Sequence, residues 1–301
     1  MSIEGKVGSG NLYLFPKLIW GLFSTPSILS PSTILFTQVN GDFAPIGVIN
    51  LSENNLKCSM RNYRSDVIPI KVLTRDTIAR MTNLYLENYE GTSEALFRHD
   101  LAEKDDAIVL YAGAELVGFT TLQVYSAQHF GSPIRIVYSG DTIVHQKDWG
   151  QQELAFAWIS RIGEIKAQAP EIPLYWFLLV KGHRTFKYLS AFGKSFFPHW
   201  KIDRSDLKPL ADQLAFASFG HDYNPDSGVV EFSESRGHLT PSIAEPTKEE
   251  FAKESTRYFL GKNPGYRKGH ELVCLCELET TNMKPFTARI FNRALHSAMK
   301  A

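Results

Sequence analysis

The chain has 301 residues, with 32 lysines and arginines balanced by 32 aspartates and glutamates. This neutral balance excludes a protein built mainly to neutralise phosphates, so we expect no nucleic-acid partner. Apolar residues make up 44% of the chain and aromatic residues 12%, which excludes wholesale disorder because a packed core can form. Only three cysteines occur, which excludes a disulfide scaffold and favours a reducing, cytoplasmic compartment: Cys58, Cys274 and Cys276.

The N-terminal residues 11–51 are strongly apolar but do not predict a membrane-spanning helix. Such a helix needs about 20 uninterrupted apolar residues, and four prolines break the run: Pro16, Pro26, Pro31 and Pro45. The segment also lacks the cleavage site of a secretory signal. We expect no membrane contact, although an interfacial anchor stays open as an alternative. We hypothesise that translation begins at Met60, which would make the apolar, proline-rich residues 1–59 a non-native extension.

Regular patterns begin at residue 67. A short strand is predicted at 67–72, and Thr74 and Ser93 are in position to cap two helices. Alternating apolar residues then predict a hairpin with strands at 107–112 and 116–125. The next predicted strand, 133–145, is interrupted at Ser139-Gly140, and a glycine inside a strand indicates a bulge or a close backbone approach.

The second half of the pattern contains a helix, a buried strand and further elements. We predict a helix opening at 149–152 and running through Ile165, and a helix at 184–196. Between them, residues 174–180 are almost wholly apolar, which is typical of a central strand covered on both faces. Helices are then predicted at 206–219, 247–260 and 282–300, and strands at 229–232 and 271–278.

The element order β-α-α-β-β-β-α-β-α over residues 67–198 resembles the GNAT superfamily of acyl-CoA-dependent N-acyltransferases. Three short motifs occur in the family's order: the apolar-Gly-apolar segment 117–119, the run KDWGQQ at 147–152 against [RQ]-x-x-G-x-[GA], and Tyr188 four residues before Phe192 against Y-x-x-x-G-F. The resemblance covers about 130 residues and implies an α/β (α+β) fold with a mixed, mostly antiparallel central sheet flanked by helices. Residues 60–198 would form this domain, and residues 199–301 a C-terminal elaboration of helices and strands packed on it.

The resemblance implies that an acyl group moves from acetyl-CoA, another acyl-CoA or a carrier thioester to an amine. Backbone amides at a helix start would face the pyrophosphate, and the expected cofactor-binding residues are Val144, His145, Lys147, Trp149, Gly150, Gln151 and Gln152. Gln152 replaces a small residue of the motif and Asp148 adds a negative charge. Two alternatives therefore stay open: a carrier protein presents the acyl group, or the pocket is vestigial.

The resemblance also implies three catalytic candidates. Tyr188 matches the acid that protonates the leaving thiolate, and Tyr138 and Asp141 lie on the strand that carries bases or water-holding groups in the family. Each has a structural alternative. Tyr188 can be a packing aromatic, Asp141 can cap a bulge, and His145 can be a surface histidine instead of a base or phosphate ligand.

Other functions and partners are weighed against acyl transfer. A catalytically inactive GNAT-like protein that binds acyl-CoA or a partner is the main alternative, and residues 11–36 motivate a third class, a membrane-peripheral enzyme that acylates lipid-like acceptors. No metal is expected, because the pair Cys274 and Cys276 lacks a second ligand pair and the loop 221–228 lacks the pattern of a calcium site. The expected partners are a small-molecule amine acceptor, an acyl carrier protein and a second copy of the chain.

Overall fold

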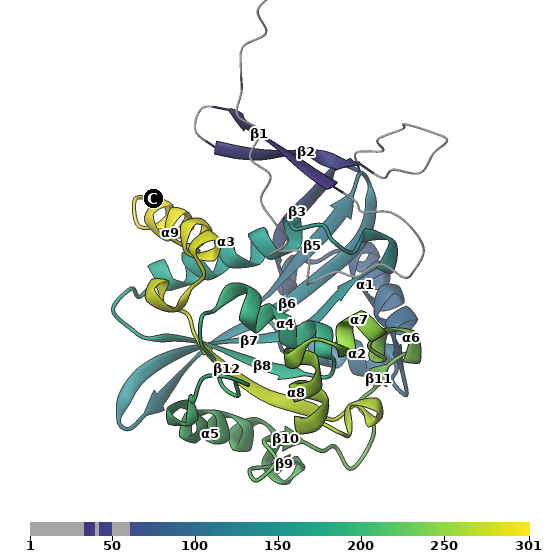
Figure 1. Ribbon diagram of the computed structural model, residues 1–301, viewed down its shortest axis with the longest axis vertical. Helices are drawn as coiled ribbons and strands as arrows, with labels where there is room; N and C mark the ends of the chain where they lie inside the picture. The colour runs from purple at the N-terminus through teal and green to yellow at the C-terminus, as the bar shows by residue number, and fades with distance from the viewer. Residues whose placement is uncertain (1–32, 40–41, 50–60) are drawn as a thin grey trace, which may run out of the picture.

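The computed structural model describes residues 33–39, 42–49 and 61–301 (Figure 1). The expected translation start at Met60 and Cys58 lie outside the described residues. Within the segment expected to be an extension, β1 (Thr33–Val39) and β2 (Asp42–Ile49) pair as an antiparallel two-stranded sheet.

The rest of the chain is organised around one eight-stranded sheet with the order β3-β5-β6-β7-β8-β12-β10-β9. All neighbours pair antiparallel except β7 and β8, which are parallel. The predicted mixed, mostly antiparallel α/β fold is thereby confirmed. The strands are β3 (Tyr63–Pro69), β5 (Asp106–Ala112), β6 (Glu115–His129), β7 (Ser132–Val144), β8 (Leu174–Val180), β9 (Tyr223–Asn224), β10 (Val229–Val230) and β12 (Glu271–Glu277); β4 (Tyr89–Glu90) and β11 (His238–Leu239) form a separate pair.

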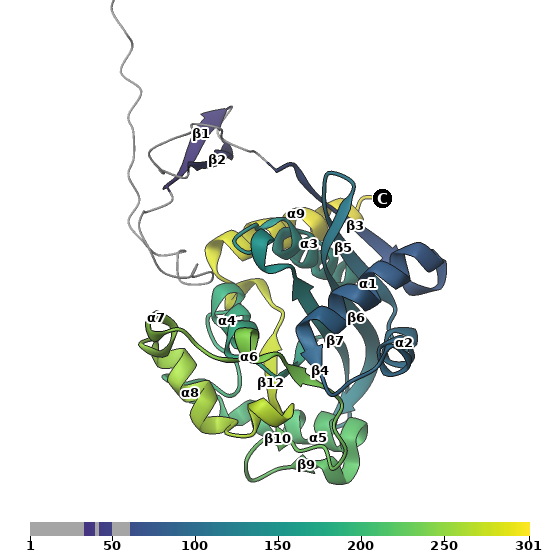
Figure 2. The ribbon, with the colours of Figure 1, turned by 90° about the vertical axis from the view of Figure 1, so that its right-hand side faces the viewer.

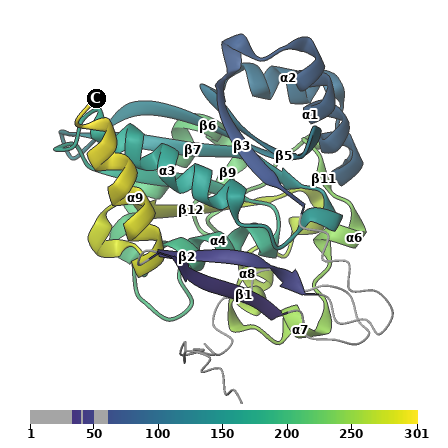
Figure 3. The same ribbon diagram turned by 90° about the horizontal axis from the view of Figure 1, so that it is seen from above.

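Helices cover both faces of this sheet (Figures 2 and 3). They are α1 (Arg75–Asn88), α2 (Glu94–Ala102), α3 (Glu153–Ala167), α4 (His183–Phe192), α5 (Lys208–Phe219), α6 (Pro241–Ala244), α7 (Lys248–Phe251), α8 (Glu254–Lys262) and α9 (Pro285–Ala298). On one face, α3, α4, α8 and α9 enclose the largest apolar core. On the other face, two separate cores lie under α1 and α2 and under α5. The strand β8 contributes to cores on both faces, which explains its continuous apolar sequence.

The helix caps follow the prediction, whereas several helix bounds differ from it. Thr74 accepts a hydrogen bond from the backbone amide of Thr77, and Ser93 accepts one from that of Leu96. Gly150 has φ +95°, outside the helical region, so the helix predicted from 149 begins only at Glu153.

Two predicted helices are shorter than expected. The helix predicted at 184–196 ends at Phe192 because Gly193 is extended. The helix predicted at 247–260 is two helices, α7 and α8, because the backbone at Lys253 is extended.

The C-terminal third completes the sheet rather than only covering it. Strand β12 pairs along β8 with Leu272 opposite Val180 and Glu277 opposite Tyr175. Cys274 and Cys276 of β12 are both buried in the core on the α3 face, as small apolar residues would be. No helix in the described ranges is long and apolar enough to cross a membrane.

Candidate active site

The parallel strands β7 and β8 pair over only part of their length. Their register runs from Arg135 opposite Leu174 to Ser139 opposite Leu178. Beyond this point β7 continues beside β6 to Val144, whereas β8 continues beside β12 to Val180. The two diverging ends border a cavity of about 220 Å³, which α1, α2 and α4 also line.

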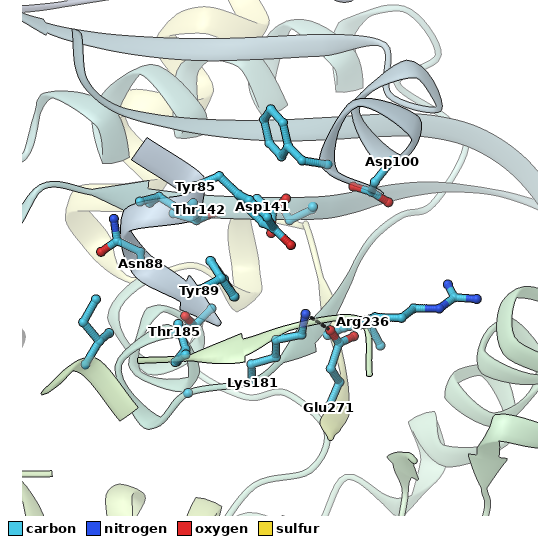
Figure 4. A pocket seen from close by; sticks show the side chains of 18 of the residues that line it. Tyr85, Asn88, Tyr89, Asp100, Asp141, Thr142, Lys181, Thr185, Arg236 and Glu271 are labelled. Atoms are coloured by element: carbon cyan, nitrogen blue, oxygen red, sulfur yellow. Dashed lines mark ion pairs between the residues drawn. The ribbon is translucent and has the colours of Figure 1, made fainter. Parts of the chain in front are cut away.

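A bulge in β7 shapes the wall of this cavity. Thr120 lies opposite Thr142 and Leu122 opposite Ser139, so Gly140 and Asp141 together face the single residue Thr121. A Cβ atom at Gly140 would lie 2.4 Å from Thr121 Oγ1, so no larger residue fits without a shift. The bulge predicted from the glycine in the strand is thereby confirmed, and the atoms that approach Gly140 belong to side chains and not to another backbone. Figure 4 shows Asp141, the second bulge residue, in the middle of the cavity.

The carboxylate of Asp141 has no hydrogen-bond or ion-pair partner among residues 61–301. Burial raises the pKa of Asp141, and the nearby carboxylate of Asp100 adds to this, while Lys181 and Lys104 act in the opposite direction; the net result is a pKa of about 7. A carboxyl group with this pKa can accept or release a proton at neutral pH.

Two ion pairs flank Asp141. Lys104 Nζ lies 2.8 Å from Asp100 Oδ1, and Lys181 Nζ lies 3.1 Å from Glu271 Oε1. Burial disfavours the Lys181 ammonium, but the carboxylates of Glu271 and Asp141 outweigh it and raise the pKa of Lys181. Lys181 therefore stays positively charged at neutral pH, next to Asp141 (Figure 4).

The two tyrosines predicted as catalytic candidates also line the cavity. Tyr188 projects from α4, and its hydroxyl has no hydrogen-bond partner in the described part of the chain. Burial raises the pKa of Tyr188 to about 12, and it raises that of Tyr138 well above its ordinary value. Both hydroxyls therefore stay protonated at neutral pH.

Two of the predicted cofactor-binding residues, Val144 and Trp149, line the cavity. The Trp149 indole donates a hydrogen bond of 2.8 Å to the carbonyl oxygen of Val144. The Arg184 guanidinium lies over the indole ring, 5.1 Å from its centroid. Trp149 is thus held in place at the α4 side of the cavity.

The other predicted cofactor-binding residues surround the loop before α3 and do not line the cavity. The backbone amides of Gly150, Gln151 and Gln152 have no acceptor within residues 61–301, which leaves them available to an anion at the start of α3. The His145 ring instead accepts a hydrogen bond from the Lys147 amide, and Lys147 Nζ forms an ion pair of 2.7 Å with Glu115.

The negative charge that Asp148 adds to the loop is neutralised. Its buried carboxylate accepts hydrogen bonds of 2.7 Å from Arg61 and 3.0 Å from the Tyr63 hydroxyl. Tyr63 is the first residue of β3, and Arg61 lies just before it. The loop therefore carries no unpaired negative charge from Asp148, and its basic side chains are neutralised as well.

Several cavity residues were not predicted from the sequence. Asp100 lies on α2, and Lys181 directly follows β8. Arg236 lies in the segment before β11, and Glu271 is the first residue of β12. For two of these residues the sequence held a signal, a charge at one end of an apolar strand: Lys181 directly follows β8, and Glu271 opens β12.

No protein-family model matches the sequence, and no curated protein matches it either. Among solved structures, the chain is similar to a probable N-acyltransferase of Enterococcus faecalis at 11% identity and a TM-score of 0.35, over 45% of this chain and 33% of that chain. It is similar to a GNAT family N-acetyltransferase of Escherichia coli in complex with CoA at 16% identity and a TM-score of 0.31, over 44% and 69% of the two chains. The match to NAA60 of Arabidopsis thaliana in complex with a bisubstrate analogue has 13% identity and a TM-score of 0.32, over 46% and 90%. The chain thus spans about a third of the length of the first of these proteins.

Proposed function

We propose that the protein is an N-acyltransferase that moves an acyl group from acyl-CoA to an amine in the cavity between β7 and β8. The observation that carries the proposal is the unpartnered carboxylate of Asp141, placed by a bulge where two parallel strands diverge. This geometry agrees with the acyltransferase resemblance of the sequence, in which the same strand carries the base.

Asp141 acts as the base that makes the acceptor amine neutral. An alkyl amine is mostly an ammonium ion at pH 7, with a pKa of about 10, and an ammonium ion has no lone pair for attack. With its pKa of about 7, Asp141 is a stronger base than an ordinary carboxylate and can take this proton inside the cavity.

The neutral amine then attacks the thioester carbonyl carbon. The C–N bond forms, the C–S bond breaks, and the sulfur leaves as a thiolate, which receives a proton and becomes the CoA thiol. The protonated Tyr188 hydroxyl donates a hydrogen bond to the leaving sulfur, because at a pKa of about 12 it does not ionise at neutral pH. The nitrogen loses two protons in all: Asp141 releases the first to solvent and regains its charge, and the second passes through solvent to the sulfur.

The pyrophosphate of CoA would be bound by the backbone amides of Gly150, Gln151 and Gln152. The basic side chains near this loop are already paired, Lys147 with Glu115 and Arg61 with Asp148. Affinity therefore depends on the amides and on the positive end of the α3 dipole.

Thermal unfolding with CoA, acetyl-CoA and longer acyl-CoAs tests the proposal. A ligand at about 100 times its Kd stabilises the folded protein by roughly 2.7 kcal/mol, which is readily measured as a shift in Tm. Stabilisation without release of free thiol in the presence of amines would favour the inactive binding protein. No stabilisation by any of these compounds would contradict both functions.

Tyr188→Phe is expected to lower turnover at least about tenfold while the Tm shift with CoA persists, because only the hydroxyl is removed. The matched control is Tyr125→Phe. Burial raises the pKa of Tyr125 to about 12 as well, but Tyr125 lies on β6 outside the cavity. Equal turnover of the two variants would show that Tyr188 only packs.

A further inference from the structure

The charged side chains in the cavity wall are mostly paired with one another or with a neighbour. Three ion pairs account for these groups: Asp100 with Lys104 at 2.8 Å, Lys181 with Glu271 at 3.1 Å, and Arg184 with Glu250 at 2.7 Å. The first two pairs bring no net charge to a ligand, and Arg184 is bound to Glu250, which also pairs with the buried Lys187 at 3.1 Å.

Two charged residues of the wall have no ion-pair partner within the described ranges, the anion Asp141 and the cation Arg236. Arg236 lies in the exposed segment between β10 and β11, with its guanidinium 4.9 Å from the centroid of the Phe232 ring. In Figure 4, Asp141 lies between Arg236 and the side of the cavity that holds Asn88. Both groups line the same cavity, and the exposed Arg236 side chain extends away from Asp141 in this view.

We infer that the acceptor amine of the proposed reaction also carries an anionic group, a carboxylate or a phosphate, which Arg236 binds while the amine faces Asp141. The inference rests on the proposed function and adds the class of acceptor to it. A guanidinium forms strong, paired hydrogen bonds with either anion.

The size and charge of the cavity disfavour other acceptors. A polyamine would bring a second cation toward Arg236 and Lys181. The volume of about 220 Å³ lies below the roughly 300–1,000 Å³ typical of sites for drug-sized ligands. A small zwitterion satisfies both unpaired charges and fits this space.

The test is a panel of amines assayed with acetyl-CoA by release of free thiol. The panel contains L-amino acids, the carboxamides of the same amino acids, O-phosphoethanolamine, spermidine and a short peptide with a free N-terminus. We expect wild-type protein to acylate an anionic amine with a higher kcat/KM than its neutral counterpart. The amino acids and O-phosphoethanolamine distinguish a carboxylate from a phosphate.

Arg236→Gln is expected to lower kcat/KM for the preferred anionic amine by about 10- to 100-fold, the range for a lost charge-assisted hydrogen bond. It should leave kcat/KM for the carboxamides unchanged, and Arg236→Lys should restore part of the loss. Arg289→Gln is the matched control, since the Arg289 guanidinium lies over a phenylalanine ring in the same way, 5.2 Å from the Phe286 centroid on α9.

Three results would overturn the inference: equal use of amino acids and carboxamides, a preference for spermidine or the peptide, or no acylation of any anionic amine. If any other amine of the panel is still acylated in these cases, the acceptor class is wrong and the proposed function stands. If no amine releases thiol although CoA and acetyl-CoA raise the Tm, the protein is the inactive binding protein and the proposed function fails as well. If neither compound raises the Tm, the proposed function itself fails.

Discussion

Asp141→Asn is expected to lower acyl transfer by at least about 100-fold, because a general base contributes roughly 10²–10⁴-fold. The kcat/KM of the wild-type protein should rise with pH through about 7, since only the ionised carboxylate can take a proton. The variant should lose this rise in kcat/KM and keep the rise at higher pH, which comes from deprotonation of the amine itself. Charged groups around Asp141 set the position of the rise: Asp100, Lys104, Lys181 and Glu271.

The same substitution is expected to stabilise the fold at high pH. The pKa of Asp141 is higher in the folded than in the unfolded chain, so the folded state binds more protons between about pH 4 and 7, and its stability falls as the pH rises through this range. Asparagine carries no charge, so it removes the free-energy cost of burying the ionised Asp141 carboxylate. At pH 8 the free energy of unfolding should increase by about 1–3 kcal/mol, and at pH 4.5 by much less.

Urea unfolding at the two pH values measures this difference. The control is Asp226→Asn, since Asp226 is exposed on the turn after β9. An Asp141→Asn protein that is as active as the wild type, or less stable at pH 8, would contradict the role given to this carboxylate.

Glu250→Gln is expected to destabilise the protein by about 3–5 kcal/mol, because it removes the carboxylate that pairs with Arg184 and with the buried Lys187. The Glu250 carboxylate, 1% exposed, lies 2.7 Å from Arg184 Nη2, 3.1 Å from Lys187 Nζ and 3.2 Å from His183 Nε2. It also completes a capping box with Thr247 at the start of α7. The Arg184 side chain of α4 is thereby held in place.

The pH dependence of stability gives a second readout of this cluster. Burial alone would raise the pKa of Glu250, but hydrogen bonds and the cations lower it; burial lowers the pKa of His183. In both cases the unfolded chain binds more protons, so stability falls as the pH drops below about 6.5 and again below about 4.5. Glu250→Gln should weaken the second decline.

The control for this prediction is Glu249→Gln, whose side chain is exposed at the neighbouring position of α7. It should change the free energy of unfolding by no more than about 0.5 kcal/mol. A loss of the same size in both variants would show that the effect comes from the helix and not from the buried charges.

The sequence predicted strand and helix identity well where local chemistry decides it. Thr74 and Ser93 cap helices, Gly140 marks the bulge, and residues 174–180 form a strand buried on both faces. It could not show that β12 pairs with β8, because alternation indicates that a strand exists but not which strand lies beside it.

The same limit applies to the site. Tyr138, Asp141 and Tyr188 were predicted as candidates from the family resemblance, and the structure brings them to one cavity. Lys181 and Glu271 lie 90 positions apart, and Arg236 lies in an irregular segment between them. Their convergence depends on the strand order of the sheet, which no local pattern encodes.

The position of β12 has a consequence for the synthesis of the protein. When residues up to 198 have left the ribosome, the strand β8 has β7 on one side and an unpaired edge on the other, and its sequence LYWFLLV contains no charge. An apolar, uncharged edge of this kind is prone to pair with other chains. It stays exposed until residues 271–277 emerge, and this segment begins 91 positions after the end of β8. Helper proteins that shield nascent chains should therefore matter most in this interval.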